Sequence, residues 1–261
     1  MDRVSTVALI ERKLSISRDL FTRYWRDVHG AMAARIPGFE TYTQYHVTAV
    51  PGVGSRDPEP FEGIAIVTYA SAADRAGLIH GEVTPHIHRD EQNVFRRALL
   101  FNLEPGGSRT VVGGAGQAGA GYFVTVPAGT AVSLDAIAAS LAGDGLLSLT
   151  VHDLTSGDPA GWNATDIDDG GTGRRFVAVL HSVWRDAASG QAALAAAIAA
   201  SGGAFAAYAI DEVFVMVDGG KPTHLALRGF DVLRTIEAAG ATNQLADEVV
   251  RAVYGAPARR G

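Results

Sequence analysis

The chain has 261 residues, with 47% hydrophobic and 19% charged side chains and a formal net charge of −6 at pH 7. This length suits one large domain or two domains of common size, each with a buried core. The acidic balance argues against nucleic acid or an anionic membrane as a partner, and the lack of cysteine excludes disulfides, thiolate catalysis and Cys-ligated metals.

Residues 1–112 follow the order strand, helix, strand, strand, helix, strand. Strands are expected at Val4–Ile10, Phe39–Val50, Gly63–Ala70 and Leu99–Leu103, the last with an extension toward Val112, and helices at Arg18–His29 and Ser71–Phe95. Gly81 and Pro85 divide the second helix into two pieces. This order is that of the ferredoxin-like βαββαβ unit.

The first helix has an apolar stripe at spacings of one, three and four residues. The stripe is formed by Leu20, Phe21, Tyr24, Trp25 and Val28. Gly30 is expected to stop or kink this helix.

Residues 113–121 read GGAGQAGAG and are interpreted as a flexible linker. Gly114, Gly116 and Gly119 match the GxGxxG pattern of dinucleotide sites. In such a site the glycine turn opens a helix, whereas a strand is expected here, so we favour the linker.

Residues 122–261 repeat the order of the first half and add C-terminal helices. Strands are expected at Tyr122–Val126, Leu146–Leu154, Arg175–Trp184 and Glu212–Val217, with another strand or hairpin at His224–Leu227, and helices at Ser133–Leu141, Ala187–Ala200, Val232–Ala239 and Gln244–Tyr254. An antiparallel sheet with helices on one face leaves its other face uncovered. We therefore predict an α+β fold in which two ferredoxin-like halves pack their sheets face to face as a single-chain, pseudo-dimeric barrel. The space between the sheets is expected to be able to hold a ligand.

The segment Arg12–Tyr45 resembles the characteristic region of EthD-domain proteins. The resembling positions are Phe21, Tyr24, Trp25, Val28, His29, Gly30, Pro37 and Gly38. The family commonly has proline after that glycine, whereas this chain has Ala31. The resemblance covers about the first 110 residues, and the second half shares only the inferred architecture.

The resemblance implies a dimeric α+β barrel with a small apolar cavity between sheet and helices, often used without a cofactor. The resemblance also implies that most family members pair two chains to close the barrel. Here the second half is expected to supply that partner, and a homodimer is a further possibility.

His29 is the leading catalytic candidate. It lies four residues after Trp25, so both side chains project from one helical face. An imidazole lining a cavity suits general acid or base catalysis. The alternative is structural: His29 caps the last helical carbonyls or bonds to a strand.

On the second strand Tyr42, Gln44 and His46 share one face. An imidazole, an amide and a phenol in a row suit proton transfer with oxyanion stabilisation, although strand tyrosines more often pack in the core. We predict Tyr42 and His46 as catalytic, and Gln44 as substrate-binding. Trp25, Tyr24 and Tyr69 are further predicted substrate contacts.

His80, Glu82, His86 and His88 form a local cluster. A helix points residues i and i+2 apart, so we predict no metal site here and no cofactor. His86 remains a catalytic candidate and His88 a substrate contact. In the second half, His152 and His181 either line a second pocket or belong to a half that only completes the barrel.

The sequence contains no serine elbow, phosphate loop or HExxH helix. We therefore predict a cytoplasmic lyase or isomerase without cofactor, acting on a hydrophobic aromatic or polyketide-like small molecule, with no nucleic-acid or membrane partner. The alternatives are a cofactor-free monooxygenase of anthrone-like substrates, a non-catalytic binder of a small ligand, and a haem or metal protein.

Overall fold

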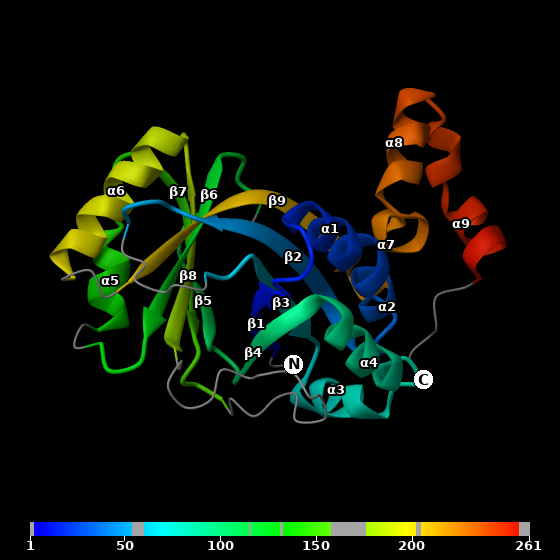
Figure 1. Ribbon diagram of the computed structural model, residues 1–261, viewed down its shortest axis with the longest axis horizontal. Coiled ribbons are helices and arrows are strands. Elements are labelled where there is room, and N and C mark those ends of the chain that lie inside the picture. Colours follow the sequence, from blue (N-terminus) through cyan, green and yellow to red (C-terminus); the bar gives the residue numbers. More distant parts are fainter. Residues whose placement is uncertain are drawn as a thin grey trace.

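The computed structural model describes residues 3–53, 60–114, 116–130, 133–157, 176–201 and 205–255 (Figure 1). The first half contains β1 (Val4–Arg12), α1 (Arg18–Tyr24), the π-helical turn η1 (Trp25–His29), α2 (Gly30–Ala33), β2 (Phe39–Ala49), β3 (Gly63–Tyr69), α3 (Ala72–Gly77), the 3-10 turn η2 (Leu78–His80), α4 (Thr84–Val94) and β4 (Phe95–Leu103). Strand β5 (Ser108–Val112) follows. The second half contains β6 (Ala120–Pro127), α5 (Leu134–Ser140), β7 (Leu146–Asp153), β8 (Phe176–Trp184), α6 (Ala187–Ala200), β9 (Ala206–Asp218), β10 (Lys221–Pro222), α7 (His224–Arg228), α8 (Phe230–Ala238), the 3-10 turn η4 (Thr242–Leu245) and α9 (Asp247–Tyr254).

Within these ranges ten strands form one antiparallel sheet. Its order is β4-β1-β3-β2-β9-β6-β8-β7-β5, with β10 paired to β9. The first four strands have the order of a ferredoxin-like unit, and β9-β6-β8-β7 repeat it. The two halves join where β2 pairs with β9, for example with Thr43 opposite Val215. The predicted α+β fold of two ferredoxin-like halves is confirmed.

The two edges of this sheet are close together because β4 and β5 are consecutive in the chain. In the tight turn between them the Gly107 amide donates to Glu104 O at 2.9 Å, and Gly106 has a φ of 83°, which favours glycine. Strand β5 then pairs with β7, so that Ser108 lies opposite His152. The barrel is therefore nearly closed. The expected extension of the fourth strand is thus a separate strand that pairs with the second half, and β6 begins at Ala120, inside the segment interpreted as a linker.

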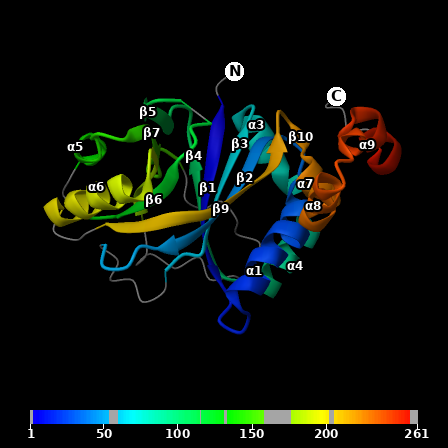
Figure 2. The same cartoon turned by 90° about the horizontal axis from the view of Figure 1, so that it is seen from above.

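The helices form two groups on the outside of the sheet. Figure 1 shows α1 to α4 on one half and α5 and α6 on the other, and Figure 2 shows the two groups at opposite ends of the molecule. The C-terminal helices lie on the side of α1 and α2. His224–Arg228 is helical, and Thr223 caps it by accepting from the Ala226 amide at 3.4 Å, so the strand predicted there is wrong. The hairpin that was the alternative is present, but its second strand is β10, before this helix. No helix in the described ranges is long and apolar enough to cross a bilayer.

Three apolar clusters make up the core. The first lies beneath α1–α4 and contains Phe21 and Trp25, and the second lies beneath α5 and α6 and contains Trp184. The third lies between the two halves and contains Phe123 and Tyr208, both fully buried. These large rings occupy the space inside the barrel where the sequence had led us to expect room for a ligand.

Candidate active site

The first helix widens at Trp25–His29 into a π-helical turn. The Gly30 amide donates to Trp25 O, five residues earlier, and Gln44 Nε2 donates to the same carbonyl at 2.9 Å. A Cβ at residue 30 would lie 2.6 Å from that nitrogen, so only glycine allows this approach. The helix continues through Gly30 into α2, so of the predicted stop or kink at Gly30 only the stop is wrong.

Only part of the predicted apolar stripe faces the core. Phe21 and Trp25 are buried as predicted, whereas Leu20 and Val28 are each 42% exposed. His29 lies on the same buried face as Trp25, with 6% exposure. A π-helical turn contains one residue more than an α-helical turn, so it changes the direction of the side chains that follow it. Such turns occur frequently at functional sites.

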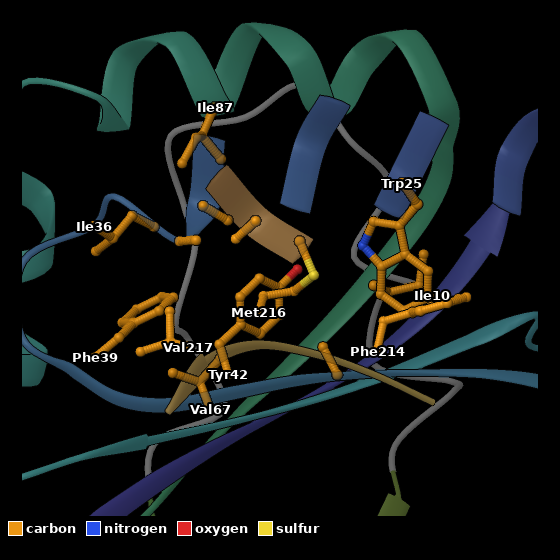
Figure 3. Close-up of a cluster of buried hydrophobic side chains, with 14 of the residues drawn as sticks. Ile10, Trp25, Ile36, Phe39, Tyr42, Val67, Ile87, Phe214, Met216 and Val217 are labelled. Carbon is orange, nitrogen blue, oxygen red and sulfur yellow. The ribbon is translucent and has the colours of Figure 1, made fainter. Parts of the chain in front are cut away.

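A cavity of about 430 Å³ lies between these helices and the sheet of the first half. Most of its lining is apolar; Figure 3 shows Ile87 from α4 and Trp25 from η1 facing the strand residues Tyr42 and Val67. The polar lining residues are Thr6, His29, Tyr42, Tyr69, Arg75, Glu91 and Asn102. Its volume is in the range of small-molecule sites.

The cavity has a closed end and a mouth. Tyr42 and Glu91 are buried lining residues, as is His29. The exposed or half-buried lining residues lie mostly on α3 and the edge strand β4 and include Ala72, Ala76, Ala98, Leu100 and Asn102. A ligand would therefore enter between α3 and β4.

His29 forms a buried pair with Asp90 of α4. His29 Nδ1 lies 3.1 Å from Asp90 Oδ2, and both side chains are 8% exposed. Because an ionised carboxylate only accepts hydrogen bonds, Nδ1 carries the proton and donates it. The other ring nitrogen, Nε2, is left with a lone pair to act as a base toward a ligand. His29 therefore does not cap the helix, as the structural alternative had it.

Asp90 is held as an anion by its neighbours. Burial alone raises the pKa of Asp90, but hydrogen bonds from His29 and Tyr24 outweigh this effect and lower the pKa below its usual value. The Tyr24 hydroxyl donates to Asp90 Oδ1 at 2.5 Å, and Asn93 Nδ2 donates to the same oxygen at 3.2 Å. The carboxylate thus fixes the orientation of the imidazole.

Tyr42 presents a neutral hydroxyl to the cavity. Burial raises the pKa of Tyr42 far above its usual value, so the phenol keeps its proton. Gln44 Nε2 donates to the Tyr42 hydroxyl oxygen at 2.8 Å. The indole N–H of Trp25 is close enough to lower the pKa of Tyr42, although it has no partner within hydrogen-bonding geometry. The Tyr42 hydrogen can therefore be donated to a ligand oxygen.

The structure brings together some of the predicted site residues and separates others. His29, Trp25, Tyr42 and Tyr69 line the cavity, whereas Tyr24 and Gln44 lie one layer behind and bond to the lining groups. His46 lies against the Trp25 ring, with ring centroids 4.6 Å apart, and does not line the cavity. His86 is exposed on α4 and lies 3.1 Å from an Arg89 nitrogen, and His88 is half-buried on the same helix.

The sequence analysis missed two acidic residues of the site, Glu91, which lines the cavity, and Asp90, which lies behind His29. Asp90 and Glu91 lie in the buried stripe of α4 between Ile87 and Val94. Carboxylates are rarely buried without a partner, so two acidic residues at core positions of an amphipathic helix are the signal that could have identified them. In the described part of the chain, no group of three or more His, Asp or Glu side chains is placed to hold a metal ion.

The histidines of the second half lie inside the barrel. The His181 ring stacks on Phe123 with centroids 4.6 Å apart, and His152 Nδ1 lies 2.9 Å from Ser108 Oγ. Burial lowers the pKa of His152 to about 3 and that of His181 to about 4. Neither residue lines the cavity of the first half.

Residues 13–95, which contain η1, His29 and Asp90, match the EthD domain family. The match begins after β1 and ends at the start of β4, so the matched segment contains all the helices around the cavity. No curated protein matches the chain.

Some solved structures are similar to most of this chain, and others are similar to a smaller part of it. An anthrone oxidase-like protein has a TM-score of 0.52 and 13% identity, over 82% of this chain and 94% of its own. An EthD family protein from Bacillus halodurans has a TM-score of 0.29 and 16% identity, over 38% of this chain and 95% of its own. The first likeness shows that the fold of two joined halves occurs in a solved protein.

Proposed function

We propose that this protein is a lyase or isomerase that moves a proton on a hydrophobic, aromatic or polyketide-like small molecule. The observation that supports this proposal is the buried His29–Asp90 pair at the closed end of an apolar cavity. General bases of this kind work near neutral pH and contribute about 10²- to 10⁴-fold to the rate.

The reaction would begin at His29. Nε2 removes a proton from a carbon that is next to a carbonyl group or conjugated with it through an aromatic ring, and the imidazolium that forms is stabilised by the Asp90 carboxylate. The electron pair of the broken C–H bond moves to the carbonyl oxygen, where the Tyr42 hydroxyl donates a hydrogen bond to the enolate. His29 then returns the proton to another carbon in an isomerisation, or to a leaving hydroxyl group in a dehydration. These steps use only groups of the chain.

The proposal is tested by deuterium incorporation into a carbon acid. Anthrone, incubated in D2O under argon, would exchange its acidic CH2 hydrogens faster with the protein than in buffer, as measured by NMR. His29→Ala is expected to reduce the enzymatic rate by about 10²- to 10⁴-fold with an unchanged circular dichroism spectrum. A folded His29→Ala variant that exchanges like the wild type would contradict the proposal.

A cofactor-free monooxygenase is the second candidate, because a solved structure of the same fold is called anthrone oxidase-like. The first step would be the same, and the carbanion would then react with oxygen, so that CH2 and O2 become C=O and H2O. Oxygen consumption and quinone formation in air identify this reaction. A protein that binds anthrone without exchange or oxidation would be a carrier. A homodimer also stays a prediction, which the molar mass in solution tests.

A further inference from the structure

A half-buried cation lies at the mouth of the cavity. Arg75 of α3 lines the cavity, and its side chain is 13% exposed. Its NH1 donates to Leu103 O at 2.6 Å and to Ser5 O at 3.4 Å, and its NH2 donates to Glu104 Oε1 at 3.1 Å. Because a guanidinium carries five N–H groups, these bonds leave donors for a ligand. The contacts of NH1 tie α3 to the sheet and hold the guanidinium in place.

Further donors lie beside Arg75. Asn102 of β4 lines the mouth, and its Oδ1 accepts from the Thr6 hydroxyl at 2.8 Å. The Asn102 side chain can therefore donate hydrogen bonds to a ligand through its amide NH2 group. The Tyr69 hydroxyl also lies near Arg75. Burial raises the pKa of Tyr69, and a hydrogen bond with Thr6 and the charge of Arg75 offset only part of this rise. Tyr69 thus stays protonated and directs its hydrogen to Thr6, because the Thr6 hydrogen is already donated to Asn102.

The two ends of the cavity present different groups. The mouth has the Arg75 guanidinium, which Glu104 also contacts, and the Asn102 amide, whereas the closed end has Glu91 and His29, with Asp90 behind His29. The guanidinium attracts an anionic ligand group to the mouth. The walls between the two ends are mainly apolar. The cavity therefore fits a molecule with an anionic oxygen at one end and an apolar body.

We propose that the substrate is an aromatic or conjugated carboxylate, bound with its carboxylate on Arg75 and Asn102 and its reacting carbon toward His29. Only one part of this inference rests on the proposed function, namely that the reacting carbon lies near His29. A planar guanidinium binds a carboxylate through two parallel hydrogen bonds, which a neutral group of the same shape cannot match. The half-exposed Glu104 carboxylate competes with the carboxylate of the ligand for the same guanidinium. This competition reduces the preference of the site for a charged over a neutral ligand.

Isothermal titration calorimetry with two probes tests the proposal. Naphthalene-2-carboxylate and naphthalene-2-carboxamide have nearly the same shape and differ in charge. The wild type is expected to bind the carboxylate on the order of tenfold more tightly. Arg75→Gln should abolish this preference, and Glu104→Gln should increase it several-fold because the competing carboxylate is gone. Arg35→Gln, which removes an exposed cation from the end of α2, is the control for net charge.

The results separate this proposal from the proposed function. Equal binding of the two probes to the wild type, no binding of the carboxylate, or an unchanged preference in Arg75→Gln would overturn the inference. If Arg75→Gln does not fold, the increase expected for Glu104→Gln decides. The assay measures binding alone, so His29→Ala is expected to keep the preference. Failure of the proton transfer would appear only in the deuterium exchange.

Discussion

Acid is expected to destabilise the protein through histidines that are buried without charge, and His152 provides the sharpest test. Its pKa is lowered from 6.5 to about 3, first by burial and then by the nearby His181. The unfolded chain therefore binds a proton that the folded chain does not, and the stability is lost as the pH falls below 6.5 toward 3. Integrated between pH 7 and pH 5, this difference amounts to about 2 kcal/mol of unfolding free energy.

His152→Gln removes the titrating ring and keeps a polar group next to Ser108, its partner at 2.9 Å on β5. Urea unfolding at pH 7 and pH 5 should show that the variant loses about 2 kcal/mol less than the wild type between the two pH values. His80→Gln is the control, because His80 is exposed at the end of η2. If His152→Gln loses as much stability as the wild type, the buried neutral state of His152 is refuted.

Two further predictions concern the packing around the π-helical turn. A Cβ on Gly63 would lie 2.5 Å from the Trp25 ring, so Gly63→Ala should cost about 1–3 kcal/mol in urea unfolding, whereas Gly77→Ala, where a Cβ meets nothing within 4 Å, should not. Phe230→Ala should lower the free energy of unfolding by about 2 kcal/mol, because the Arg26 guanidinium lies 4.0 Å from the Phe230 ring centroid. A loss of stability below about 0.5 kcal/mol would mean that the contact of α8 with η1 does not stabilise the fold.

The sequence predicts most of the fold because its two halves have clear periodicity and turn signals. Ser17, Ser133 and Asp186 cap their helices, which begin within two residues of the predicted starts. The closure of the sheet was not predictable, because it depends on β5 leaving the first half to pair with β7. A strand of five residues carries no local sign of its distant partner.

The candidate site was predictable in part. His29 and Trp25 lie on the predicted face, and the family resemblance places them on the first helix. The π-helical turn was not predictable, because it depends on Gln44 reaching the Trp25 carbonyl from a neighbouring strand. Asp90 was missed for a similar reason: its partner His29 is 61 residues away in the sequence.

The rate of deuterium exchange in Asp90→Asn tests the central claim most directly, because the claim is that Asp90 makes His29 an effective base. An amide at residue 90 keeps the shape of the side chain but cannot stabilise the imidazolium. We predict at least a tenfold lower exchange rate than in the wild type, with the cavity still able to bind anthrone. An Asp90→Asn protein that folds, binds anthrone and exchanges it at the wild-type rate would contradict the account.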